Sequence, residues 1–116
     1  MAIVDKPTDY FNTVLYTGNG STQSITGLDF QPDFTWIKPR SVSYGHALFD
    51  SVRGAGKRLI SNDTGAEGTF NAFESFDSNG FSLSVDGGIA INANGDTFAS
   101  WNWKAGTAWS NDASAT

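Results

Sequence analysis

Four turn dipeptides recur along this sequence and divide it into short segments. Asn-Gly occupies positions 19–20, 79–80 and 94–95, and Asp-Gly occupies positions 86–87. Both dipeptides tolerate the positive φ angles that tight hairpins require. The segments between the turns are short and rich in apolar and β-branched residues, and none sustains the periodicity of a helix. Short segments at intervals of about 8–12 residues are typical of an all-β protein.

The spacing predicts an antiparallel β-sandwich or jelly roll with about eight short strands. Pro39 cannot donate a ladder hydrogen bond, so we expect it at the end of its strand or on an edge. The chain has 116 residues, enough for one ordinary domain. We expect this single domain to span residues 1–106, and the small, polar residues 107–116 to form a linker-like tail. The expected strands lie at 13–18, 22–26, 33–40, 46–51, 57–61, 70–76, 81–85 and 97–104.

The last expected strand shows the clearest alternation. Trp101 and Trp103 share one face with Ala99, whereas Ser100 and Asn102 share the other face with Phe98. Because the two indoles are large and apolar, we expect both to point into the core of the sandwich. We also expect an aromatic residue of the segment 33–40 beside them, either Phe34 or Trp36.

The composition argues against several classes of function. The chain has no Cys, which rules out disulfides, thiolate metal sites and thiol catalysis within it. Its net charge of −5 repels duplex DNA and anionic membranes, so we expect no nucleic-acid partner. No apolar run approaches the ~20 residues that span a bilayer, so we expect no membrane insertion. We expect no cofactor and no metal ion.

The segment 52–59 contains Gly56-Lys57, the dipeptide that closes a phosphate-binding loop. The full pattern needs a Gly at the position of Ser51 and a Ser or Thr at the position of Arg58. A helix should also follow, whereas 57–61 has the pattern of a strand. We therefore interpret the segment as a Gly-rich turn that enters a strand.

Catalytic side chains are the next candidates. His46 is the only His, and no G-x-S-x-G nucleophile motif accompanies it. Glu74 and Asp77 lie close enough in sequence to suggest a glycosidase pair. Asp77 is better explained as the first residue of a turn, where its side chain accepts a backbone hydrogen bond.

Two further polar clusters are candidates. Residues 61–68 suggest calcium binding only weakly, because the spacing of a calcium loop is absent. Asp50 and Arg53 are three residues apart, and we expect them to form an ion pair that shapes the turn.

Exposed aromatic and polar residues suggest a ligand or partner patch. Sugars stack on exposed aromatic rings, and Trp109 stands in a polar segment. The residues that we expect to form this patch are Tyr44, His46, Arg53, Lys57 and Trp109.

Five motifs in order resemble a repeat domain of bacteriophage virion proteins, found mainly in tail or fibre proteins of marine and cyanobacterial phages. The motifs are YTGNG at 16–20, PDFTWIK at 32–38, LFDSVRG at 48–54, FDSNGF at 76–81 and WNWKAG at 101–106. Together they cover about residues 10–106. The resemblance implies a lectin-like, SPRY-like or concanavalin A-like β-sandwich without a catalytic pattern.

The resemblance implies a non-enzymatic virion module, made in the host cytoplasm and carried on the particle as part of a tail fibre or as capsid decoration. Its expected partners are other virion proteins and further copies of itself. A carbohydrate-binding receptor domain that contacts host surface glycans is the alternative. A glycan hydrolase built on Glu74 and Asp77 is a third hypothesis.

Overall fold

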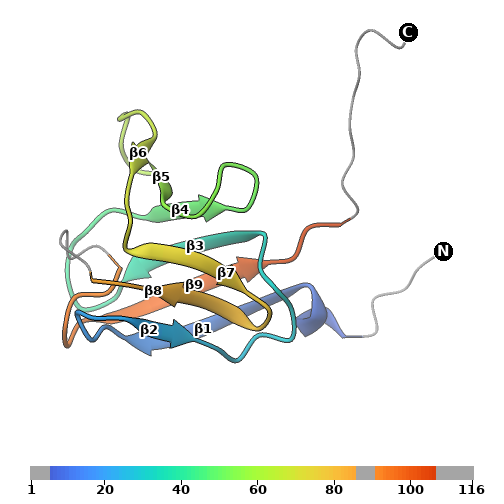
Figure 1. The fold of residues 1–116 in the computed structure, drawn as a ribbon. Helices are drawn as coiled ribbons and strands as arrows, with labels where there is room; N and C mark the ends of the chain where they lie inside the picture. The colour runs from blue at the N-terminus through green and yellow to red at the C-terminus, as the bar shows by residue number, and fades with distance from the viewer. Residues whose placement is uncertain (1–5, 86–90, 107–116) are drawn as a thin grey trace, which may run out of the picture.

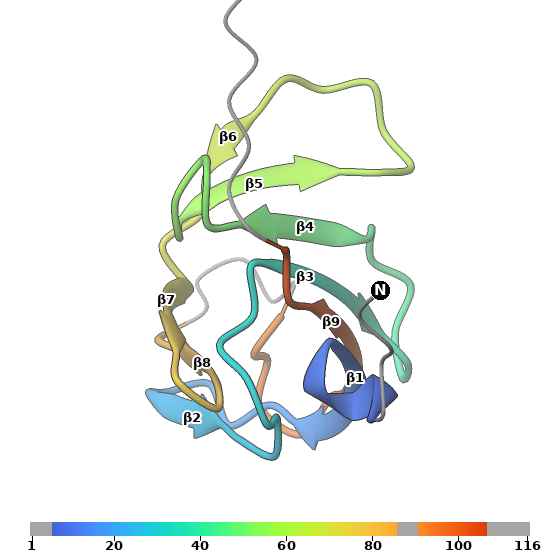
Figure 2. The same ribbon diagram turned by 90° about the vertical axis from the view of Figure 1, so that its right-hand side faces the viewer.

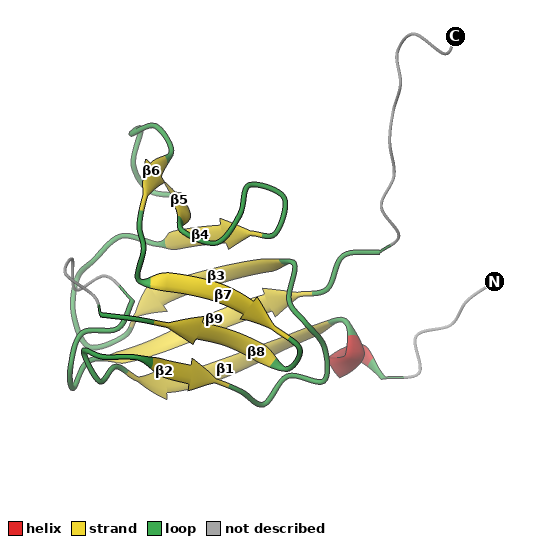
Figure 3. Ribbon diagram, in the orientation of Figure 1, coloured by secondary structure: helices red, strands yellow, loops and turns green. Residues whose placement is uncertain are grey.

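The computed structural model describes residues 6–85 and 91–106. The described residues form nine strands and one short 3-10 helix, η1 (Pro7–Asp9), as Figures 1 and 3 show. The first five strands are β1 (Phe11–Thr17), β2 (Gln23–Ile25), β3 (Phe34–Pro39), β4 (Ala47–Asp50) and β5 (Lys57–Ile60). The other four are β6 (Gly68–Thr69), β7 (Phe73–Asp77), β8 (Gly80–Leu83) and β9 (Thr97–Trp103).

The strands pair into two antiparallel sheets. The larger sheet has the order β1-β9-β3-β4-β5-β6, and the smaller has the order β2-β8-β7. The smaller sheet lies over β1, β9 and β3, while β4, β5 and β6 extend beyond it (Figures 1 and 2). This arrangement confirms the prediction of an all-β, antiparallel β-sandwich. Eight of the strands lie within or next to the expected segments, and β6 is additional.

The core between the sheets is built on stacked Phe rings. Phe73 lies between Phe49 and Phe81, with ring centroids 4.4 Å and 5.2 Å away and nearly parallel planes. Tyr16 stacks on Phe98 at 5.2 Å and donates its hydroxyl proton to the carbonyl oxygen of Ile91. The four Phe side chains are almost completely buried. Burial of these aromatic rings contributes strongly to the hydrophobic stabilisation of so small a domain.

The faces of β9 are the reverse of the prediction. Phe98, Ser100 and Asn102 are fully buried between the sheets. Trp103 is 37% exposed, and Trp101 is only partly buried. The expectation that both Trp side chains enter the core is therefore wrong, although the alternation itself is correct.

Hydrogen bonds explain how polar side chains occupy the inner face of β9. Thr35 Oγ1 donates to Asn102 Oδ1 at 2.9 Å, and Asn102 Nδ2 donates to Ser100 Oγ at 3.1 Å. Asn102 Nδ2 also lies 3.3 Å from the carbonyl oxygen of Asn12, and Ser100 Oγ donates to that of Val14 at 3.1 Å. No buried side-chain nitrogen or oxygen in the described residues lacks a partner. Burial of a polar group is expensive only when its hydrogen bonds are unmade, so this face tolerates burial.

The expected neighbours of the two Trp residues are correct. Phe34 lies opposite Trp103, and Trp36 lies opposite Trp101 in the β3–β9 ladder. All four rings project from the side of the larger sheet opposite the core. Pro39 is the last residue of β3, as expected.

We expect Phe73→Ala to lower the free energy of unfolding by roughly 3–5 kcal/mol, because the truncation leaves a cavity in the ring stack. Trp103→Ala should cost only about 1 kcal/mol, because its ring lies between Phe11 and Phe34 on the outer side of the sheet and keeps contact with water. Urea unfolding followed by circular dichroism measures both values. A larger loss for Trp103→Ala than for Phe73→Ala would contradict the assignment of the faces.

Candidate functional site

The outer side of the larger sheet carries an aromatic face, which we define as Phe11, Phe34, Trp36, His46, Trp101 and Trp103. Strand register brings these side chains together. Trp103 lies opposite Phe11 on β1 and opposite Phe34 on β3. The centroid of its ring system is 5.1 Å from that of Phe11 and 5.0 Å from that of Phe34. These three residues form a continuous row across β1, β9 and β3.

A second row runs parallel to the first. Trp101 lies opposite Trp36, and their rings meet edge to face at 6.3 Å. His46, just before β4, meets Trp36 edge to face at 5.5 Å. Leu48 on β4 lies opposite Trp36 and continues the row. The smaller sheet covers the opposite side of the larger one, and no described strand packs on the aromatic face (Figure 2).

One hydrogen bond holds His46 in place. The indole Nε1–H of Trp36 donates to His46 Nδ1 at 2.8 Å. An imidazole that accepts at Nδ1 carries its proton on Nε2, so Nε2–H is a donor. Within the described residues, the indole N–H groups of Trp101 and Trp103 form no hydrogen bond. The face therefore combines planar apolar rings with hydrogen-bond donors.

The rings enclose a hollow of about 250 Å³, lined by Trp36, His46, Trp101 and Trp103. None of the four carries a carboxylate, a hydroxyl or a thiol. The chemistry of this lining suits contacts made by stacking and by donated hydrogen bonds.

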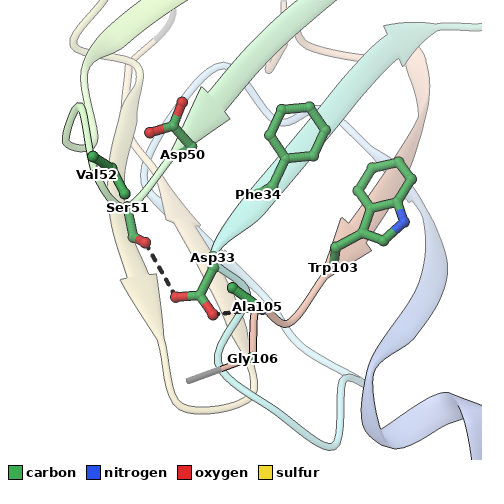
Figure 4. A pocket seen from close by; sticks show the side chains of 8 residues that line it. All are labelled: Asp33, Phe34, Asp50, Ser51, Val52, Trp103, Ala105 and Gly106. Carbon is green, nitrogen blue, oxygen red and sulfur yellow. Dashed lines mark hydrogen bonds between the residues drawn. The ribbon is translucent and has the colours of Figure 1, made fainter. Parts of the chain in front are cut away.

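A second hollow lies at the end of the sheet, where β3, β4 and β9 converge (Figure 4). Its carboxylates have structural partners. Asp33 accepts hydrogen bonds from Ser51 Oγ at 3.1 Å and from the backbone N–H of Ala105 at 2.8 Å. Figure 4 shows these two bonds on one side of the hollow and the rings of Phe34 and Trp103 on the other. Asp33 thus ties the segment after β9 to the turn after β4.

The structure divides the predicted patch into two groups. His46 belongs to the aromatic face, and Tyr44, which is 37% exposed, lies in the same loop before β4. Arg53 and Lys57 lie beyond the other end of β4, where Arg53 Nη1 donates to the carbonyl oxygen of Lys57 at 3.3 Å. Trp109 lies outside the described residues. The four described residues of the expected patch therefore lie beyond opposite ends of β4, two at each end.

The expected ion pair between Asp50 and Arg53 is confirmed. Arg53 donates its Nε–H to Asp50 Oδ2, and its backbone N–H donates to Asp50 Oδ1 at 2.8 Å. Arg53 Nη1 also contacts Glu67 at 3.2 Å. Burial raises the pKa of Asp50, but hydrogen bonds from Arg53 and its positive charge outweigh burial and leave that pKa below its ordinary value. The pair holds the turn that leads into β5.

That turn is the segment that resembled a phosphate loop. Gly54 and Gly56 have φ angles of 102° and 80°, and β5 begins directly afterwards at Lys57. The segment 52–59 is therefore a Gly-rich turn followed by a strand, as we interpreted it from the sequence, and no helix follows it.

The glycan hydrolase hypothesis rested on Glu74 and Asp77, and the structure places these two carboxylates in different surroundings. Asp77 accepts hydrogen bonds from the hydroxyls of Ser75 and Ser82, at 2.8 Å and 2.5 Å. The expected backbone hydrogen bond to Asp77 is replaced by these two, because β7 and β8 place both serines beside it. Glu74 is exposed on β7.

No His, Asp and Glu cluster able to hold a metal ion occurs in residues 6–85 and 91–106. In the segment 61–68, Asp63 Oδ1 accepts the backbone N–H groups of Thr64 and Gly65. The same described ranges contain no helix long and apolar enough to cross a membrane.

The sequence held one signal for the aromatic face. Lys38 has the same parity in β3 as Phe34 and Trp36, so all three side chains share a face. A Lys is rarely buried, so its parity marks that side of β3 as the outer one. The register with β9 then places Trp101 and Trp103 on the same side.

We expect the contribution of the Asp50–Arg53 pair to depend on pH. Folding lowers the pKa of the Asp50 carboxyl, so its charged form stabilises the folded protein at pH values above its unfolded pKa of about 4. The stabilisation is lost as the pH falls through the pKa that the group has in the folded protein. Arg53→Gln should therefore lower the free energy of unfolding by about 1–2 kcal/mol at pH 7, and by less below about pH 4.

Urea titrations at both pH values measure this loss. The exposed Lys57→Gln removes the same charge and serves as the control. An equal loss for Arg53→Gln at both pH values would show that the ion pair does not act through Asp50.

The comparisons with known proteins identify a family. A family model described as "Domain of unknown function (DUF7483)" matches residues 6–116. No curated protein and no solved structure matches the chain. The match covers all of the described residues and nearly all of the sequence. The chain therefore belongs to the DUF7483 family.

Proposed function

We propose that this domain is a non-enzymatic interaction module of a bacteriophage virion, and that it contacts its partner through the aromatic face. The observation that carries the proposal is the position of Phe11, Trp101 and Trp103 outside the core. Aromatic residues, Trp above all, dominate the binding energy of interfaces. Rings that face water add little folding stability to a small domain, so a partner accounts for them better than the fold does.

The chemistry of the site supports binding over catalysis. His46 is the only His in the sequence, and its Nδ1 is engaged by Trp36. Asp33, Asp50 and Asp77 accept hydrogen bonds that secure strand ends and turns. The assignment to a virion rests on the five ordered motifs of the sequence. A tail-fibre role and a capsid-decoration role both fit it, with other virion proteins as partners.

Mass spectrometry of purified particles of the encoding phage tests the location. We expect to detect the chain in the purified particles, in a fixed number of copies per virion. Trp101→Ala and Trp103→Ala particles should lose the chain or its contact while the isolated variants stay folded. The exposed Val52→Ala, outside the aromatic face, is the control. Absence of the parent chain from intact particles would overturn the proposal.

Carbohydrate binding is the second candidate function for the same face. A pyranose ring has an apolar face of C–H groups and a rim of hydroxyls that accept hydrogen bonds. The apolar ring surfaces of Trp36 and Trp101, which meet edge to face, fit the C–H face of the sugar, and the N–H groups of His46, Trp101 and Trp103 fit its hydroxyls. The lining residues of the hollow include no Asp, Glu, Lys or Arg, which favours a neutral host glycan.

A glycan array followed by titration calorimetry tests this candidate. We expect the parent to bind a neutral host polysaccharide, and Trp101→Ala to weaken binding by roughly tenfold to a hundredfold through loss of one stacking partner. His46→Phe should keep the platform but lose the N–H donor. Parent protein that is folded yet silent on host polysaccharides would exclude the carbohydrate function.

A further inference from the structure

The sandwich has four outer edges, and three of them are protected against strand addition. Within the described residues, β2 has three residues and β6 has two. The edge strand β7 carries the acidic residues Glu74 and Asp77 and an irregular register between Phe73 and Ser75. Short length, charge and bulges are the devices by which proteins keep sheet edges from pairing with other chains.

The fourth edge, β1, has none of these devices. It runs for seven residues from Phe11 to Thr17 and contains no charged residue, no Pro and no Gly. Its register with β9 is unbroken over the whole length, and β9 is its only strand neighbour in the described residues. Its sequence, FNTVLYT, is rich in the β-branched and aromatic residues that favour strands.

Hydrogen bonds beyond both ends of β1 show which backbone groups point outward. The carbonyl oxygen of Tyr10 accepts the N–H of Lys104, and the N–H of Gly18 donates to the carbonyl oxygen of Asp96. In an antiparallel ladder, alternate residues direct both backbone groups to the same neighbour. The even-numbered residues of β1 therefore bond to β9, and the odd-numbered residues point away from the sheet.

Two of the outward backbone groups are already engaged. The N–H of Thr13 donates to Asn12 Oδ1 at 2.9 Å, and the carbonyl oxygen of Thr17 accepts Gln23 Nε2–H at 3.1 Å. Between them, no described residue bonds to the outward N–H or carbonyl oxygen of Leu15. The Leu15 side chain is 59% exposed. The middle of β1 thus offers a donor and an acceptor at β-strand spacing, flanked by an exposed apolar side chain.

We propose that β1 pairs antiparallel with β1 of a second copy of this chain, with the Leu15 residues of the two copies directly opposite each other. An identical strand supplies outward groups at the same spacing, as a twofold interface requires. Each chain carries a net charge of −5, but β1 is uncharged, so the contact opposes no like charges. A second copy therefore fits this edge better than a charged strand of another protein.

The pairing has a functional consequence. The side chains of Phe11, Thr13 and Leu15 share the outer side of the sheet with Trp101 and Trp103. Antiparallel pairing keeps directly opposed residues on one side of a sheet. The two larger sheets then join into one, with both aromatic faces on the same side. This deepens the proposed function, because two linked faces bind a repeating ligand or virion lattice with avidity.

Sedimentation-velocity and equilibrium experiments on the purified full chain, without any ligand, test the proposal. We expect the mass to approach twice the 12.4 kDa of one chain as concentration rises. Leu15→Pro removes an outward N–H that β9 does not use, and should raise the dimer dissociation constant roughly tenfold or more. Leu15→Thr keeps both backbone groups and, as the matched control, should still dimerise.

Circular dichroism establishes that each variant is folded. If Leu15→Pro does not fold, Leu15→Lys replaces it, because it places two positive charges close together across the twofold axis. A parent that stays monomeric up to about 1 mM, the weak end of specific association, overturns the proposal. The proposal is also overturned if the dimer persists in Leu15→Pro and Leu15→Lys but is lost in Trp101→Ala. That result would place the contact on the aromatic face. Neither result alters the virion test above.

Discussion

The hydrogen bonds among Thr35, Ser100 and Asn102 set the orientation of β9, and the rest of the molecule depends on that orientation. Side chains alternate along a strand, so burial of Asn102 places Trp103 outside, and a shift of one residue would reverse every position. Asn102 is buried because its side chain finds partners on β1, β3 and β9 itself. Given those bonds, Phe98 joins the core and the indoles form a surface.

The core and the proposed recognition surface consequently lie on opposite sides of one sheet. The stack of Phe49, Phe73 and Phe81 joins the larger sheet to the smaller one. The rows built on Trp36, Trp101 and Trp103 stand on the reverse side, and no described strand covers them. Substitutions on the outer side are therefore expected to change what the domain binds more than whether it folds. Asp33 and Asp50, held by neighbouring donors, secure the strand ends that keep this surface in register.

Much of this fold is predictable from the sequence. The turn dipeptides and the alternation predicted eight strands and correctly grouped Trp101 with Trp103 and Ser100 with Asn102. The side of β9 that faces the core was predicted wrongly, because apolar character favoured the indoles. The partner that makes burial of Asn102 possible is Thr35, which lies 67 positions away in the sequence. The local sign of the correct orientation was Lys38, whose side chain shares a face of β3 with Phe34 and Trp36 and so marks that face as the outer one. The strand β6 was missed because two residues of pairing leave no periodic pattern. Tyr44 and Arg53, which we expected in one patch, lie beyond opposite ends of β4, a separation that residue types alone do not reveal.

Thiol labelling of single-Cys variants tests the orientation of β9 most directly, since the chain contains no Cys of its own. Ser100→Cys is nearly isosteric and lies on the inner face, whereas Trp103→Cys lies on the outer face. The native Trp103→Cys protein should react with a thiol reagent at nearly the rate of the urea-unfolded chain. The native Ser100→Cys protein should react slower by orders of magnitude, at the rate at which the domain opens. Fast labelling at position 100 together with protection at position 103 would contradict the account and return the indoles to the core.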